Sequence, residues 1–232
     1  MFDEPMIDLK RQLAEYAGFV EHMIEKSIQG LLRNNREMLR EVVEKDEPKA
    51  NDCENRLDEL CLTMIAKYQP RASDLRTILM TLGMNKDLER MADHAVNLAE
   101  DGLYLIDRPQ VKPLIDIPRM AEETTAMVRD SIRSFLTEDA NLAKAVCERD
   151  GVVDTLKEQI VKELVAFMSA DPSTIERSIH LLNIARNLER IADLSTNVGE
   201  DVIFMVEGRV IKHHKGEDGP DCEEGKTNHS HS

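Results

Sequence analysis

Aromatic residues are scarce in this chain of 232 residues: they make up 3% of the positions, and tryptophan is absent. β-Sheets draw on aromatic and β-branched side chains, whereas Leu, Ala, Glu, Lys and Arg, which are plentiful here, favour helices. The composition therefore predicts an all-α protein. The chain is long enough to build two hydrophobic cores of ordinary size.

Basic residues are also in deficit, because 30 Lys and Arg residues stand against 45 Asp and Glu residues, a formal net charge of −15. Binding to nucleic-acid phosphates needs clustered Lys and Arg, so we expect no nucleic-acid partner. No run of 18 uncharged apolar residues occurs, which predicts no direct insertion into a membrane. The opening residues, MFDEPMIDLK, are acidic where a signal peptide is basic, so we expect a cytoplasmic protein.

The cysteines are few and none of them forms a CxxC pair; they are Cys53, Cys61, Cys147 and Cys222. Three of them lie inside helical patterns. Reduced thiols in a cytoplasmic protein are therefore a better interpretation than a metal or redox site built from cysteine.

Apolar residues recur at spacings of three and four along most of the chain, which is typical of amphipathic helices. Three such segments precede the proline-rich stretch DRPQVKPLIDIP, and three follow it. The sequence predicts two tandem homologous three-helix bundles, at residues 1–107 and 119–211, joined by a linker at 108–118. Residues 212–232 are polar and without periodicity, so we expect a disordered tail there. Pro48 interrupts the second helical pattern and should kink or restart that helix.

A segment of the third helical pattern occurs twice: LERMADHAVNLAED, residues 88–101, returns as LERIADLSTNVGED, residues 188–201. On a helix, each copy carries an acidic stripe beside a seam of small apolar residues that lets a neighbouring helix approach closely. The stripes are Glu89, Asp93, Asn97 and Glu100 in the first copy and Glu189, Asp193, Asn197 and Glu200 in the second. Arg90 and Arg190 are expected to point elsewhere, which leaves both stripes without a cation on their own helix.

Carboxylates at positions i and i+4 of a helix lie about 6 Å apart along its axis, and their oxygens can converge on a hard cation. A single pair of this kind is most often a solvent-exposed helix face. Here the pair recurs, as Glu89 with Asp93 and as Glu189 with Asp193, while the surrounding residues differ. The recurrence favours a metal-binding role.

The middle helices of the two halves differ in the carboxylates that they could contribute to a metal site. The second half offers Asp150 and Asp154 at the same i,i+4 spacing, whereas the first offers Glu47 and Asn51 on either side of Pro48. Four carboxylates from two helices can surround a multinuclear metal site. We therefore expect the second half to bind metal more strongly, and removal of its third-helix pair to cost more metal than removal of the first.

No catalytic apparatus is evident in the sequence. It shows no Ser/His/Asp ordering, no Gly-rich phosphate loop and no Glu-x-x-His pair, so we expect a protein that is not an enzyme. His94 follows Asp93 but points about 100° away from it, which favours a structural or surface role. The alternative is a metal-carboxylate enzyme, which turnover abolished by Asp193→Ala would identify. A further alternative is an accessory protein of another phosphate permease or transporter, which neighbouring genes would reveal.

The doubled motif, NKDLERMADHAVNLAE and ARNLERIADLSTNVGEDVIFMVEG, resembles the PhoU family, as do the opening FDEPMIDLKRQLAEYAGFVEHMIEKSIQGLL and the segment YQPRASDLRTIL. The resemblance covers residues 2–213. It implies two three-helix bundles and a cytoplasmic negative regulator of the phosphate-starvation response. Proteins of this kind are expected to act between the ATPase subunit of the phosphate ABC transporter and a phosphate-sensing histidine kinase, and to restrain uptake when phosphate is plentiful.

The resemblance also implies a multinuclear metal cluster, with iron as the first expectation and zinc, manganese or nickel as alternatives. Carried over by position, its ligands would be Glu89, Asp93, Asp150, Asp154, Glu189 and Asp193. Asn51, Pro48 and Leu194 depart from the family pattern, which puts full metal loading of the first bundle in doubt. The acidic, helical character is compatible with a homodimer.

Overall fold

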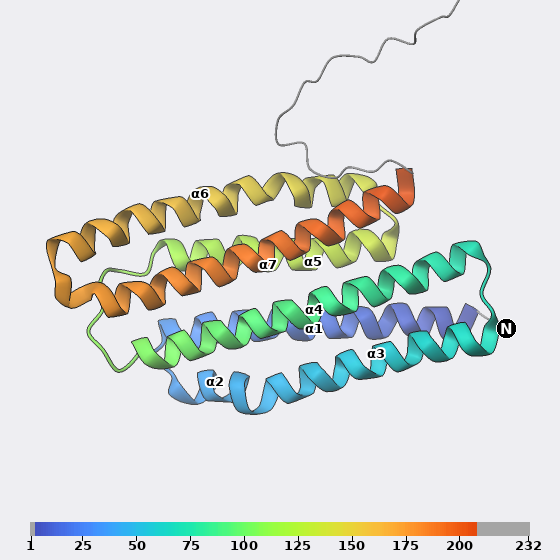
Figure 1. Ribbon diagram of the computed structural model, residues 1–232, viewed down its shortest axis with the longest axis horizontal. Coiled ribbons are helices and arrows are strands. Elements are labelled where there is room, and N and C mark those ends of the chain that lie inside the picture. The colour runs from blue at the N-terminus through green and yellow to red at the C-terminus, as the bar shows by residue number, and fades with distance from the viewer. Residues whose placement is uncertain (1–2, 208–232) are drawn as a thin grey trace, which may run out of the picture.

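The computed structural model describes residues 3–207, and this part of the chain is helical without a β-strand. Its elements are α1 (Asp3–Leu32), α2 (Arg36–Glu41), a π-helical turn (Val42–Asp46), α3 (Glu47–Tyr68), α4 (Ala72–Leu105), α5 (Asp116–Thr137), α6 (Ala140–Ala170), a 3₁₀ turn (Pro172–Thr174) and α7 (Ile175–Glu207). Helices α1, α3 and α4 form one bundle, and α5, α6 and α7 form a second beside it, with α4 against α7 and α1 against α5 (Figure 1). The predicted fold of two tandem three-helix bundles is confirmed. The predicted tail, 212–232, and the expected end of the second bundle at 211 lie outside the described residues.

The first helices of the two bundles bury matching positions. The buried pairs are Leu13 and Ile117, Tyr16 and Met120, Ala17 and Ala121, Val20 and Thr124, Met23 and Met127, Ile24 and Val128, Ser27 and Ser131, Ile28 and Ile132, and Leu31 and Phe135. Because the spacing within each pair is constant, the two helices present the same face to their bundles. By this register Lys26 of α1 corresponds to Asp130 of α5.

The seam of small residues predicted on the third helices is buried along both α4 and α7. Its members are Leu88, Ala92, Ala95, Ala99 and Gly102 on α4 and Leu188, Ala192, Ser195, Gly199 and Val202 on α7. At Gly199 the approach of α6 is close: a Cβ there would lie 3.1 Å from the Ala143 carbonyl oxygen and 3.1 Å from Cys147 Sγ. The acidic stripes therefore border packed helix faces.

The middle helix of the first bundle restarts near Pro48, as predicted, through a π-helical turn at Val42–Asp46. A π-turn accommodates one extra residue in a helix, and Pro48 falls in the first turn of α3, where a missing N–H breaks no helical hydrogen bond. Beyond the turn, α3 and α6 again bury matching positions, namely Ala50 and Val153, Leu57 and Ile160, and Cys61 and Leu164. In this register Glu54 of α3 corresponds to Lys157 of α6.

The connection between the bundles spans residues 106–115, because α4 ends at Leu105 and α5 begins at Asp116. Pro118 belongs to the first turn of α5, where the backbone N–H has no helical acceptor to lose. Other helix ends have local causes. Gln69 and Glu138 adopt left-handed backbone conformations after α3 and α5, and the Asp139 side chain accepts hydrogen bonds from the first turn of α6. The predicted division into domains at residues 1–107 and 119–211 stays a prediction.

The expectations about membrane insertion and about the cysteines can be compared with the structure. No helix among residues 3–207 has the length and hydropathy needed to cross a membrane. Cys53, Cys61 and Cys147 are free thiols, and Cys222 lies outside the described residues. Burial, followed by the charge of Asp58, raises the pKa of Cys61 to about 12. A thiol of that pKa is protonated at neutral pH, so it is a poor nucleophile and a poor metal ligand as it stands.

Candidate functional site

The predicted metal-ligating carboxylates lie along α4, α6 and α7. Asp93 is exposed, whereas the other five, Glu89, Asp150, Asp154, Glu189 and Asp193, are partly buried at the edges of the helix contacts. Within residues 3–207, no three His, Cys, Asp or Glu side chains lie close enough together to bind one metal ion as they stand. The structure therefore brings the predicted ligands into the same regions without a preformed coordination shell.

In the first bundle, a carboxylate that the sequence analysis did not select joins the stripe of α4. Burial, followed by the nearby charges of Asp93 and Glu54, raises the pKa of Glu89. Burial and the charges of Asp58 and Asp93 likewise raise the pKa of Glu54 on α3. Glu54 and Asp58 have the same i,i+4 spacing as the predicted pairs, so the signal was present in the sequence one turn beyond Asn51. These carboxylates, Glu54, Asp58, Glu89 and Asp93, are called the first acidic cluster below.

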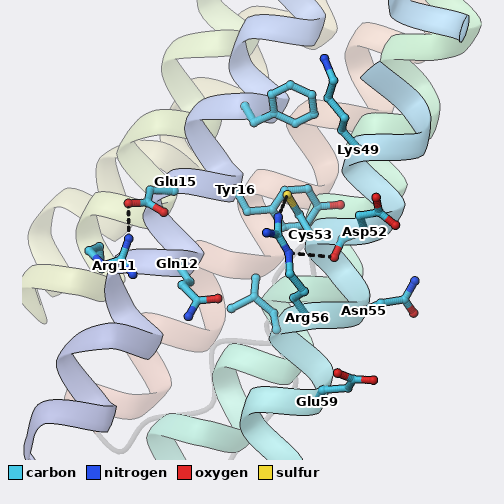
Figure 2. Close-up of a pocket in the computed structure, with 12 residues that line it drawn as sticks. Arg11, Gln12, Glu15, Tyr16, Lys49, Asp52, Cys53, Asn55, Arg56 and Glu59 are labelled. Carbon is cyan, nitrogen blue, oxygen red and sulfur yellow. Dashed lines mark hydrogen bonds and ion pairs between the residues drawn. The ribbon is translucent and has the colours of Figure 1, made fainter. Parts of the chain in front are cut away.

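Tyr16 of α1 lies beside the first acidic cluster. Its side chain is 1% exposed, and its hydroxyl has no hydrogen-bond partner among the described residues. Burial raises the pKa of Tyr16, and the charges of Glu54, Cys53, Glu89 and Asp93 raise it further, so the phenol stays protonated. Tyr16 also lines a groove of about 940 Å³ between α1 and α3 (Figure 2). A protonated phenol there is a hydrogen-bond donor without an acceptor, next to carboxylates that no Lys or Arg of residues 3–207 contacts at ion-pair distance.

In the second bundle, cations already occupy the stripe of α7. Lys157 of α6 donates to Glu189 at 2.7 Å. Arg190 donates to Asp193 at 3.1 Å, so the expectation that this arginine points away from the stripe is wrong. The reason is local, because side chains at i and i+3 of a helix lie on neighbouring positions of its surface. Burial and the charges of Glu189 and Asp154 still raise the pKa of Asp193, against the opposing effect of Arg190.

The two sites therefore differ in the charges on their middle helices, most plainly where Glu54 of α3 corresponds to Lys157 of α6. Where the first bundle has Glu54 next to Glu89 and Asp93, the second has Lys157 paired with Glu189. The expectation that the first bundle is the weaker metal site remains untested. The charges argue against it, because a metal ion at the second site would be repelled by Lys157, which already binds one oxygen of Glu189.

The histidines at the contact between α4 and α7 have structural partners, as expected for His94. His94 donates from Nδ1 to the side-chain oxygen of Asn187 on α7 at 2.9 Å, since an amide oxygen can only accept. His180 Nδ1 lies 2.6 Å from Asp101 of α4, and its ring stacks on Tyr104. Both histidines thus connect α4 with α7 and do not face the acidic stripes as ligands.

Burial and the charges of Glu200 and Asp150 raise the pKa of Cys147 to about 11, so this thiol is protonated at neutral pH.

Comparison with known proteins agrees with the repeat seen in the helices. The model of the PhoU domain matches residues 13–102 and again residues 117–202. A phosphate-specific transport system accessory protein PhoU homolog from Aquifex aeolicus is 40% identical over 206 residues, which cover 89% of this chain and 93% of that protein. The PhoU homolog 2 of Thermotoga maritima is 32% identical over 214 residues, covering 91% of this chain and 90% of that protein.

Solved structures show the same arrangement of helices. The crystal structure of PhoU from Pseudomonas aeruginosa superposes with a TM-score of 0.85 at 30% identity, and the match covers 90% of this chain and 100% of that one. The phosphate transport system regulatory protein PhoU from Streptococcus pneumoniae superposes with a TM-score of 0.84 at 23% identity, covering 92% of this chain and 100% of that one. At the lower identity the likeness concerns the fold alone.

Proposed function

Because the chain belongs to the PhoU family, we propose that it is an accessory regulator that restrains a phosphate uptake system when phosphate is plentiful. The observation that supports this proposal most is that the similarity extends over nearly the whole chain. Both bundles match the family, and curated relatives named for phosphate-specific transport align over almost their whole length. A protein that regulates by association needs surfaces rather than a catalytic constellation, and the acidic stripes at the edges of the helix contacts supply such surfaces.

In this function the acidic stripes bind metal cations. Burial and neighbouring carboxylates raise the pKa of Glu54, Glu89 and Asp193, so the anionic form of these side chains is unfavourable there, and a hard cation would stabilise it. The residues that would hold metal are Glu54, Glu89 and Asp93 in the first bundle, and Asp150, Asp154, Glu189 and Asp193 in the second. Carboxylate-rich helical bundles hold iron and manganese, which suits a multinuclear cluster of such metals here. A bound metal would supply positive charge at the stripe.

The proposed partners are the ATPase subunit of the phosphate ABC transporter and a phosphate-sensing histidine kinase. An acidic surface attracts basic patches on a partner and orients the encounter, and metal loading would weaken that attraction by neutralising the stripe. Association at the membrane would then run through these partners. A second copy of this chain is a further proposed partner, which analytical ultracentrifugation would detect.

Deletion of the gene in its native strain tests the regulatory role. In rich phosphate, the deletion should raise phosphate uptake and phosphatase expression, and the wild-type gene should restore both. A gene carrying Glu89→Ala with Asp93→Ala should restore them less completely. If deletion leaves uptake and phosphatase expression unchanged in rich phosphate, the proposed function is wrong.

Elemental analysis of the purified protein at several chelator concentrations tests the metal sites separately. Glu89→Ala with Asp93→Ala should release more metal than Glu189→Ala with Asp193→Ala, because Lys157 already neutralises Glu189. Equal losses would contradict the argument from charge. A larger loss from the second bundle would instead support the expectation drawn from Pro48 and Asn51.

A further inference from the structure

A groove of about 700 Å³ runs between α4 and α7, on the contact between the two bundles. Three arginines line it, namely Arg90 from α4 and Arg186 and Arg190 from α7. The acidic residues in its lining are Glu100 and Asp101. The groove is therefore richer in positive charge than a chain of net charge −15 leads one to expect.

The charges of the groove are separated along its length. Two contacts, His94 with Asn187 and His180 with Asp101, fix the antiparallel register of α4 and α7. That register sets Arg90 beside Arg190 and leaves Asp101 at the opposite end. Arg90 and Asp101 stand eleven residues apart on α4, a rise of about 16 Å. Hence Arg90 and Arg190 lie at one end of the groove, and Arg186, one helical turn before Arg190, lies between them and the level of the groove's own carboxylates. The stretch that holds the three arginines is called the arginine end below.

The arginine end keeps free hydrogen-bond donors. Arg186 is exposed and has no carboxylate within ion-pair distance among residues 3–207. Arg90 lies 3.8 Å from Asp87, and Arg190 lies 3.1 Å from Asp193 and 3.8 Å from Glu189. A guanidinium group carries five N–H donors, so these contacts leave donors available on each arginine.

We propose that Arg90, Arg186 and Arg190 bind a phosphoryl oxyanion at this end of the groove. Guanidinium groups form paired N–H···O bonds with phosphate oxygens, and three of them match a group that carries about −1.5 to −2 charges at neutral pH. The strongly negative net charge of the chain repels anions in general, so a local cluster of arginines is needed for any anion to bind. The anion is either inorganic phosphate or the terminal phosphate of a nucleotide.

Isothermal titration of the full-length protein, with chelator present, tests this site. Inorganic phosphate and ATP are titrated separately, at an ionic strength near 0.15 M that screens distant charges. Arg186→Gln should weaken binding about tenfold, because it removes a charge-assisted pair of hydrogen bonds. The matched control is Arg133→Gln on the exposed face of α5, which makes the same change of charge outside the groove.

Each outcome decides the proposal. Saturable binding of phosphate or of ATP, weakened by Arg186→Gln and unaffected by Arg133→Gln, supports it and identifies the source of the phosphoryl group. Absence of saturation with both anions overturns it. Equal weakening by both variants also overturns it, since the effect would then be one of net charge. Titration measures binding directly, so the result does not depend on the regulatory role proposed above.

Discussion

The two bundles bury the same positions but place opposite charges at the contacts between their helices. In the first bundle Lys26 of α1 pairs with Asp46 at 2.8 Å, while in the second Asp130, at the position of Lys26, pairs with Arg149 at 2.7 Å. The same inversion separates Glu54 from Lys157 at the acidic stripes. The attraction of an ion pair depends on the product of its charges and not on which helix carries the cation. A repeated fold can therefore invert its ion pairs while it keeps its apolar core.

Of the substitutions proposed here to test the difference between the bundles, Lys26→Ala should lower the free energy of unfolding most. Asp46 is buried, with a side chain 6% exposed, and Lys26→Ala would leave it only the exposed Lys49, at 3.3 Å, as a cation. Loss of one partner of a buried ion pair costs about 3–5 kcal/mol, and because Lys49 remains we expect the free energy of unfolding to fall by about 3 kcal/mol, the lower end of that range. Urea unfolding followed by circular dichroism measures the change.

Arg149→Ala is the matched control in the second bundle. Asp130 and Arg149 have side chains 19% and 37% exposed, so water can solvate the remaining carboxylate. A loss of about 1 kcal/mol is expected for this more exposed pair. Equal losses in the two variants would show that burial does not distinguish the pairs.

Lys157→Glu would give the second bundle the charge arrangement of the first. Glu189, with a side chain 12% exposed, would then face another carboxylate instead of its cation. Destabilisation of about 2 kcal/mol is expected in chelator, because a partly buried charge loses its partner. Added metal should recover part of that loss. Urea unfolding with and without metal measures both effects.

Lys162→Glu on the same helix provides the control, since Lys162 and its partner Glu158 are both exposed. An exposed pair of this kind contributes about 0.5 kcal/mol. If Lys157→Glu costs no more than Lys162→Glu, the ion pair with Glu189 contributes little. The contrast drawn between the two metal sites would then lose its basis.

Gly199→Ala probes the closer approach of helices in the second bundle, where the first bundle has Ala99 at the same place in the repeat. The added Cβ would meet Ala143 and Cys147 at 3.1 Å, so α6 and α7 must move apart. Overpacking costs about 1–3 kcal/mol and the better helix propensity of Ala returns up to about 1 kcal/mol. We expect a net loss of about 1 kcal/mol in urea unfolding.

Gly151→Ala in α6 separates the two contributions, because nothing lies within 4 Å of a Cβ at that position. It should stabilise the protein by up to about 1 kcal/mol through helix propensity alone. Stabilisation by both alanines would show that the helices yield at Gly199 without cost.

Periodicity predicted the parts of the fold that burial dictates. The buried seam from Leu88 to Gly102 and its copy on α7 follow from residues spaced by three and four, since a helix brings those positions to one face. The π-turn at Val42–Asp46 was not predictable in this way, because one extra residue only shifts the phase of a pattern. Pro48 predicted where the helix is interrupted, but it did not predict that the interruption is a π-helical turn.

The site was less accessible to sequence analysis than the fold. The pairing of Lys157 with Glu189 joins residues 32 positions apart, and it depends on which faces of α6 and α7 meet. The contact of Arg190 with Asp193, by contrast, was available from their i,i+3 spacing. The role of Glu54 required knowing that α3 faces the stripe of α4. Local pairs can thus be predicted, and cross-helix pairs require the packed structure.

Tyr16→Phe should have a small effect, and it bears on a buried hydroxyl of the first bundle that the second lacks, since Met120 occupies the matching position of α5. The buried Tyr16 hydroxyl has no acceptor among the described residues, so its removal should stabilise the metal-free protein by about 1 kcal/mol. If the hydroxyl donates to a carboxylate of the first acidic cluster once metal draws the cluster together, the same variant should bind less metal. Urea unfolding in chelator and elemental analysis separate these effects. Destabilisation in chelator would mean that the hydroxyl already has a partner in the metal-free protein.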